Sequence, residues 1–168
     1  MAINFATTTT ALQNSSGNNI PRIIQIKETT TTDWITKTGG QQVTEFNCNI
    51  TPSNSTSHIW LIANVACGAD AAYDGGMTFT KGGSNLSDSI GTSASSVNAS
   101  FITGMNENNA FCNQYTGIHV DHPNTTSQIT YGLKAYPNGS RTMYINRRGI
   151  DTTYTSRSRL IVIEIGDI

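Results

Sequence analysis

The sequence predicts an all-β protein, an antiparallel jelly-roll sandwich, and the last third of the chain gives the clearest signals. Apolar and polar residues alternate over 129–135, which is the pattern of a strand with one buried face. Asn138 and Gly139 together are typical of a tight hairpin turn. An aliphatic run over 160–165, unbroken to Ile163 and interrupted only by Glu164, indicates a strand covered on both faces. We therefore expect three strands here, the last of them in the core.

The first half of the chain contains further extended segments. Short strands are expected over 22–27 and 34–37, before a glycine pair that breaks the chain. Strict alternation predicts a half-buried strand over 42–51. The run over 58–67 is apolar at odd and even positions alike. We expect it to be a central strand lying between two layers.

The middle of the chain has weaker patterns. Residues 77–81 and 84–90 predict a hairpin across a glycine pair. Residues 91–110 predict a long surface loop around one short strand near 100–102, and extended structure resumes over 111–120. No segment combines a helical period with caps. About nine or ten short strands without a short repeat favour the jelly roll over a propeller or a β-helix.

The chain of 168 residues is expected to form one jelly-roll domain over 20–168. Residues 1–19 are polar and predict a short N-terminal arm, with Ile3, Phe5 and Leu12 as its apolar contacts. This segment cannot bury itself alone. It is either a free tail or an arm that orders against a partner subunit.

Composition limits the possible partners. Charged residues make up 12% of the chain and the net charge is −1, which argues against nucleic acid as a partner. No secretion signal precedes the first strand, and no run approaches the roughly 18 apolar residues of a membrane span. We expect a soluble protein made in a cytoplasm. Its three cysteines are dispersed, which favours buried free thiols over a disulfide framework or a zinc site.

The chemical motifs of the chain are few. His119, Asp121 and His122 are the one local cluster of potential metal ligands, and alternation would point the first two the same way. The alternative is a strand end followed by a turn at Pro123, and we assign no metal or other cofactor. No catalytic motif or nominable carboxylate pair is present, so we expect no enzymatic activity.

Basic and aromatic residues gather near the C-terminus. Two roles are open for the arginines: binding an acidic polymer, or forming a solvated face with ion pairs across subunits to Glu164 and Asp151. The tyrosines could stack on sugars or pack in the core and interface. The arginines are Arg141, Arg147, Arg148, Arg157 and Arg159, and the tyrosines are Tyr131, Tyr136, Tyr144 and Tyr154.

The segments 121–131, 143–147 and 160–165 together resemble virion structural proteins of marine tailed bacteriophages, notably those that infect cyanobacteria. The resemblance spans roughly residues 55 to 168 and includes the apolar strand at 59–65. Such modules are similar to the trimeric jelly rolls of the tumour-necrosis-factor and C1q type. The resemblance therefore implies a homotrimer on the outside of a phage particle, with no catalytic residues.

The resemblance leads to a specific hypothesis: a capsid decoration or cement protein that contacts the major capsid protein or other virion proteins. The alternative is the receptor-binding head of a tail fibre, which would recognise a host surface glycan or protein through loops 68–76 and 91–110. The chain begins at Met and has no fibre shaft, which favours the first hypothesis. Besides the arm residues, the residues expected in the core or at the threefold interface are Tyr131, Leu133, Ile145, Ile161, Ile163 and Ile165.

Overall fold

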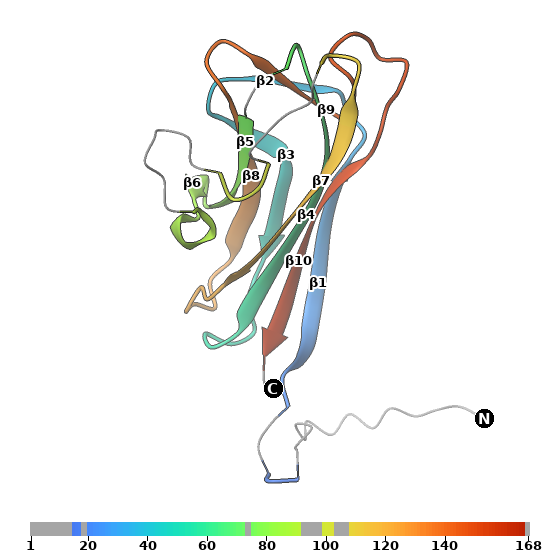
Figure 1. The fold of residues 1–168 in the computed structure, drawn as a ribbon. Helices are drawn as coiled ribbons and strands as arrows, with labels where there is room; N and C mark the ends of the chain where they lie inside the picture. The colour runs from blue at the N-terminus through green and yellow to red at the C-terminus, as the bar shows by residue number, and fades with distance from the viewer. Residues whose placement is uncertain (1–14, 18–19, 73–74, 92–98, 103–107, 167–168) are drawn as a thin grey trace, which may run out of the picture.

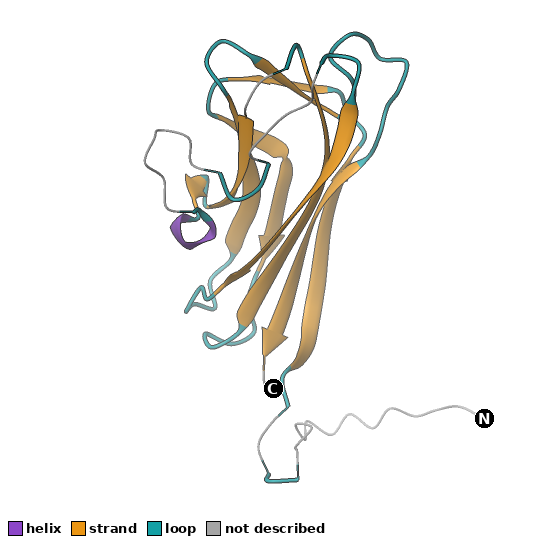
Figure 2. Ribbon diagram, in the orientation of Figure 1, coloured by secondary structure: helices purple, strands orange, loops and turns teal. Residues whose placement is uncertain are grey.

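A computed structural model describes residues 15–17, 20–72, 75–91, 99–102 and 108–166. Within these residues the chain is nearly all β, as Figures 1 and 2 show. The strands are β1 (Arg22–Thr31), β2 (Ile35–Thr38), β3 (Gln41–Ile50), β4 (His58–Ala69), β5 (Gly75–Lys81), β6 (Ser84–Asn85), β7 (Cys112–Asp121), β8 (Ile129–Pro137), β9 (Thr142–Ile145) and β10 (Ser158–Gly166), and the 3-10 helix η1 (Ser87–Ser89) follows β6.

Two antiparallel sheets face each other, which confirms the predicted sandwich. In one sheet β4 pairs with β7 on one side and with β10 on the other, and β1 pairs with the far side of β10. The other sheet has the order β3, β8, β5, β6. Eight strands divided in this way between two four-stranded sheets form a jelly roll. We call these the first and second sheets.

The short strands β2 and β9 extend the first sheet at the end opposite to the start of β1. β9 pairs with β4 beyond the end of β10, and β2 pairs with β9. Residues 32–34 separate β1 from β2, so the two are successive parts of one edge of the sheet. In Figure 1 this upper end is at the top, and β1 begins and β10 ends at the lower end.

The core lies between the two sheets and is made by alternate residues of each strand. β4 contributes Ile59, Leu61, Ala63 and Val65, all with no exposed surface. From the opposite sheet come three side chains that are also buried: Phe46, Phe79 and Leu133. Cys48 and Cys67 are buried thiols outside any disulfide, as expected, and Cys112 is half-buried.

The predicted hairpin at Asn138 and Gly139 is wrong. A turn does form there, because Arg141 N donates to Asn138 O at 3.2 Å and Gly139 has a φ of 59°. The strands on either side belong to different sheets, however: β8 pairs with β3 and β5, whereas β9 pairs with β2 and β4. The turn crosses from one layer to the other.

Covering on both faces is confirmed only for residues 65–69 of β4, whereas β10 and the first half of β4 are covered on one face. In β10, Leu160 and Val162 are fully buried toward the core, while Ile161 and Ile163 remain half-buried on the outside. β4 shows the same asymmetry: Leu61 is buried and Trp60 is 41% exposed. The outer side of the first sheet therefore presents apolar side chains that the described part of the chain does not cover.

Candidate functional site

The outer faces of the two sheets differ in chemistry. On the second sheet, outward side chains are polar and bind one another. Gln42 Nε2 donates to Thr80 Oγ1 at 2.9 Å, and Thr130 Oγ1 donates to Asn49 Oδ1 at 2.6 Å. A polar outer face of this kind is usual for an antiparallel sheet with one side packed on the core. The outer face of the first sheet is the one that needs explanation.

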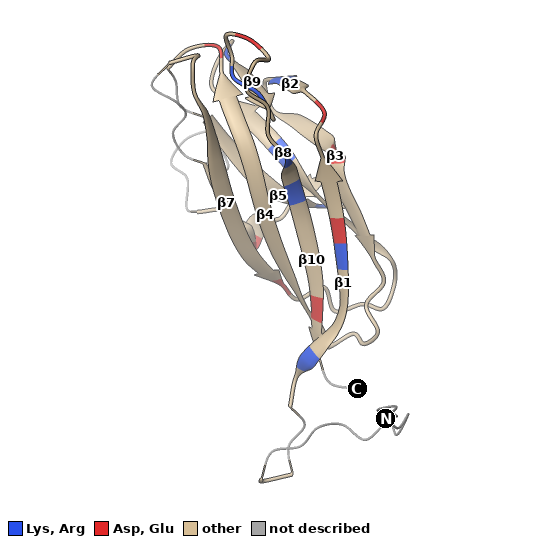
Figure 3. Cartoon of the chain, turned by 90° about the vertical axis from the view of Figure 1, so that its right-hand side faces the viewer, with Lys and Arg blue, Asp and Glu red and all other residues tan. Residues whose placement is uncertain are grey.

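Outward residues of β1, β10, β4 and β7 form a continuous apolar surface. Figure 3 turns this sheet toward the viewer, and β4 has no Lys, Arg, Asp or Glu along its length. We call this surface the apolar face. It consists of Ile23, Ile26, Trp60, Ile62, Ile118, Val120, Ile161, Ile163 and Ile165.

The strand register aligns these residues in rows, because directly paired residues of antiparallel strands point to the same side. Trp60 lies between Ile163 of β10 and Val120 of β7, and Ile26 of β1 completes its row. The next row places Ile62 between Ile161 and Ile118. Each of the four strands thus contributes to one apolar surface.

Large parts of this surface reach solvent. The exposed fractions are 57% for Ile26 and 65% for Ile118. Isolated exposed apolar residues are ordinary on soluble proteins, whereas contiguous patches mark interaction sites. The apolar face is a contiguous patch, since its members are cross-strand neighbours.

The upper boundary of the apolar face is formed by the segment that follows β9 and by polar residues. A Cβ on Gly68 of β4 would lie 2.4 Å from Arg147 O, so the segment after β9 lies directly on this strand. Below it, Arg159 pairs with Asn64 in the register, and Arg159 Nη1 lies 3.5 Å from Glu28 Oε1. The patch therefore ends at a polar rim, the usual border of a protein interface.

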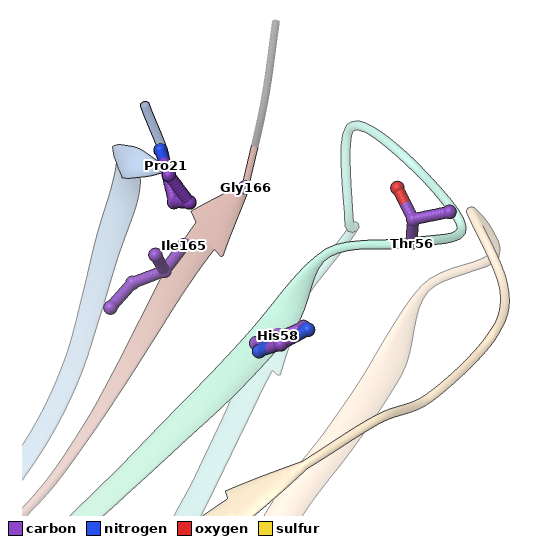
Figure 4. A pocket seen from close by; sticks show the side chains of 5 residues that line it. All are labelled: Pro21, Thr56, His58, Ile165 and Gly166. Carbon is purple, nitrogen blue, oxygen red and sulfur yellow. The ribbon is translucent and has the colours of Figure 1, made fainter. Parts of the chain in front are cut away.

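The lower boundary is formed by two histidines and a small pocket. The rings of His58 and His122 meet edge to face, with centroids 4.3 Å apart. Beside His58 the pocket opens toward the ends of β1 and β10. Figure 4 shows the residues that line it: Pro21, Thr56, His58, Ile165 and Gly166.

The structure separates the predicted metal cluster, because two of its residues lie on the inner face of β7 and the third directly follows the strand. His119 and Asp121 point inward together, as alternation predicted, and His122 points outward. His119 Nε2 lies 3.4 Å from Asp88 Oδ1. No group of three or more potential metal ligands occurs among the residues that the structure describes.

Asp121 instead joins the two sheets. The Tyr131 hydroxyl of β8 donates to its carboxylate, and Lys81 Nζ of β5 lies 2.8 Å from Asp121 Oδ2. Burial, and then the hydrogen bond to the carboxylate, raise the pKa of Tyr131 above its ordinary value. Tyr131 and Lys81 both bind the carboxylate of Asp121, so the cluster acts as a link between layers.

The six residues expected in the core or at the threefold interface divide between the core and the outer surface of the first sheet. Tyr131, Leu133 and Ile145 have no exposed surface and belong to the core of the protomer. Ile161, Ile163 and Ile165 lie on the apolar face. The arm residues Ile3, Phe5 and Leu12 lie outside the described residues.

Most C-terminal arginines have partners within the chain. Arg148 forms a two-pronged contact with Asp151, at 2.9 and 2.7 Å, and lies over the Tyr154 ring. The Arg147 guanidinium lies 3.9 Å from the centre of the Tyr144 ring. The expected partner Glu164 is buried and accepts hydrogen bonds from Gln25, Ser53 and Ser57. Asp151 and Glu164, for which ion pairs across subunits were one expectation, are therefore both bonded within the chain.

Sequence reasoning missed several residues of the apolar face. Ile23, Ile26, Trp60 and Ile118 belong to it, and none of them was singled out from the sequence. The available signal was the two-sided apolar pattern of 58–67, which predicted a covering layer on both sides. Ile118 could not be found this way, because it lies in a segment where apolar and polar residues alternate. Only the strand register places it beside Ile62 on the outer face.

No protein-family model matches the chain, and the curated proteins contain no significant match to it. Among the described residues, no helix has the length and apolarity needed to cross a membrane.

Proposed function

We propose that this protein is a non-enzymatic structural protein of a phage particle, and that it forms homotrimers through the apolar face. The observation that carries the proposal is the continuous apolar surface on the outside of β1, β10, β4 and β7. Association removes this surface from water. A large aliphatic or aromatic side chain gains about 1.5–3 kcal/mol when it passes from full exposure to full burial.

A second copy of the chain suits this surface. Its central rows contain one charged residue, Glu28 at the β1 edge beside Ile161, and that carboxylate already pairs with Arg159 of the same chain, so two such faces can meet without an unpaired charge. A trimer agrees with the resemblance of the sequence to trimeric jelly-roll modules. In a closed ring each copy contacts two neighbours, and apolar side chains converge around the axis.

The place on a particle follows from the same resemblance. The leading role is decoration or cementing of a capsid, where binding to the assembled shell stabilises it by mass action. The receptor-binding head of a tail fibre uses the same fold and assembly. The two roles differ in copy number: on the order of hundreds of copies under icosahedral symmetry, against a few tens at a tail.

Sedimentation equilibrium tests the assembly. We expect the wild type at three times the chain mass, and Trp60→Lys and Ile163→Lys at the mass of one chain, because each variant places a charge inside the interface. Asn49→Lys, an exposed position on the polar second sheet, is the control and should remain trimeric. A monomeric wild type, or trimeric face variants, would overturn the proposed assembly.

Purified particles test the setting. Mass spectrometry should detect the protein in phage particles, and gel densitometry should give its copy number relative to the major capsid protein. Hundreds of copies support the decoration role, and a few tens support the fibre head. Absence from particles that contain the other virion proteins would contradict both roles, without affecting the assembly measured by sedimentation.

A further inference from the structure

His58 and His122 form a pair that no sequence motif indicates. They come from β4 and from the end of β7, and the register that pairs Ile59 with Asp121 brings them together. Their ring centroids are 4.3 Å apart with an angle of 68° between the ring planes. The pair lies on the outside of the first sheet, at the lower edge of the apolar face.

The ring nitrogens of this pair are available. Both residues are exposed, and neither imidazole has a hydrogen bond or ion pair within the described part of the chain. The nearest carboxylates along the strands, Asp121 and Glu164, point to the opposite side and are buried. Neighbouring outward positions are apolar, so no cation of the described chain competes with a metal ion there.

The backbone that carries the histidines is well ordered by local bonds. β4 and β7 pair continuously from Ile59 and Asp121 to Gly68 and Cys112. After His122 the chain turns through Asn124, whose φ is 51° and whose Nδ2 donates to His122 O at 3.1 Å. Two exposed rings on such a frame can rotate to aim one nitrogen each at a common point.

We propose that His58 and His122 together bind one divalent transition-metal ion of the zinc class. Imidazole is a preferred ligand of Zn²⁺, Ni²⁺ and Cu²⁺, whereas Mg²⁺ and Ca²⁺ prefer carboxylate oxygens, and the nearest carboxylates, Asp121 and Glu164, are buried on the other side of the sheet. Each ring coordinates through one nitrogen. Water fills the remaining positions, which open to solvent. The site is complete in one chain and does not depend on the proposed trimer.

Zinc titration followed by imidazole NMR tests the site, because the chain has three histidines. We expect the signals of His58 and His122 to move together and saturate at one ion per chain. The inward-facing His119 is the internal reference and should not follow them. Ca²⁺ at the same concentrations should leave all three signals unchanged.

Two exposed variants, His58→Gln and His122→Gln, decide whether the histidines act as a pair. Loss of either ligand should weaken zinc binding at the remaining histidine at least about tenfold. The titration is repeated on Ile163→Lys, so that a failure of self-association cannot be mistaken for a failure of the metal site. Unmoved His58 and His122 signals, or unchanged affinity in a single-histidine variant, would overturn the proposal.

Discussion

Trp60 and Ile163 are directly opposed on neighbouring strands, and both side chains point away from the core. A Trp and Ile pair of this kind stabilises an antiparallel sheet by side-chain contact. The pair still leaves 41% of the indole exposed, at the middle of a surface that four strands share. The same contact that supports the sheet therefore also creates the surface proposed for self-association.

Trp60 offers a direct optical test of that surface. The chain has two tryptophans, and Trp34 lies outside the apolar face, between β1 and β2. In Trp34→Phe, we expect the emission of Trp60 to shift to shorter wavelength as protein concentration rises, because association removes the indole from water. The matched variant Trp60→Phe reports Trp34 alone and should show no shift. A concentration-independent spectrum in both variants would contradict burial of Trp60.

Asn146 is the centre of a buried network at the upper end of the first sheet. Its Nδ2 donates to Thr31 O and Asp33 O, each at 3.0 Å, and its Oδ1 accepts from Ser158 Oγ at 2.6 Å. Asn146→Ala removes all three hydrogen bonds, two of them fully buried, and we expect a loss of about 3 kcal/mol in the free energy of unfolding. Urea denaturation measures it. Asn124→Ala is the control, since Asn124 shares the positive φ but is exposed, and should lose less than about 1 kcal/mol.

The layers and most strands of this fold could be predicted, because alternation records which side of a strand is buried. Strand pairing could not. Asn138 and Gly139 determine a local turn, but whether the next strand returns to the same sheet depends on contacts with β2 and β4, which are distant in sequence. The same limit concealed the pair of His58 and His122, which only the register of β4 and β7 reveals.

The apolar face could be predicted in part. The pattern over 58–67 and 160–165 indicates a covering layer on both sides of each strand, but within the described chain the outer side is covered only over residues 65–69. A sequence does not say whether the covering layer belongs to the same chain or to another copy. The structure places no described segment over Ile62 or Ile161. The layer that the sequence predicts on this side would therefore come from another copy of the chain.

Tyr131 links the sheets through Asp121, and Tyr131→Phe removes that bond while keeping the ring. We expect the free energy of unfolding to fall by about 2 kcal/mol at neutral pH, because the buried Asp121 carboxylate loses one hydrogen-bond donor. Lys81 is then its remaining partner in this cluster. The raised pKa of Tyr131 means that its stabilisation is complete below pH 10, the ordinary value, and is lost as pH rises toward the folded-state pKa. The difference between wild type and variant should therefore shrink above pH 10.

Denaturation of both proteins between pH 7 and pH 11 measures this difference. Tyr136→Phe is the control, because its hydroxyl bonds to the half-buried amide of Asn85 and joins no buried charge. We expect it to cost less than about 1 kcal/mol at every pH. A Tyr131→Phe protein as stable as the wild type at pH 7 would show that the link to Asp121 contributes nothing to the fold.

Glu164 should dominate the acid sensitivity of the lower end. Burial alone would raise its pKa, but hydrogen bonds from Gln25, Ser57 and Ser53 outweigh burial and hold the pKa below its ordinary value of 4.5. The stabilisation is therefore present above about pH 4.5 and is lost as pH falls through the folded-state pKa. In Glu164→Gln the new amide faces these donors, so we expect a loss of about 2 kcal/mol at pH 7 and a weaker dependence on pH between about 5 and 3. Urea denaturation across that range measures both quantities. Asp33→Asn, an exposed carboxylate, should change neither, whereas parallel pH profiles for wild type and Glu164→Gln would exclude Glu164 as the source.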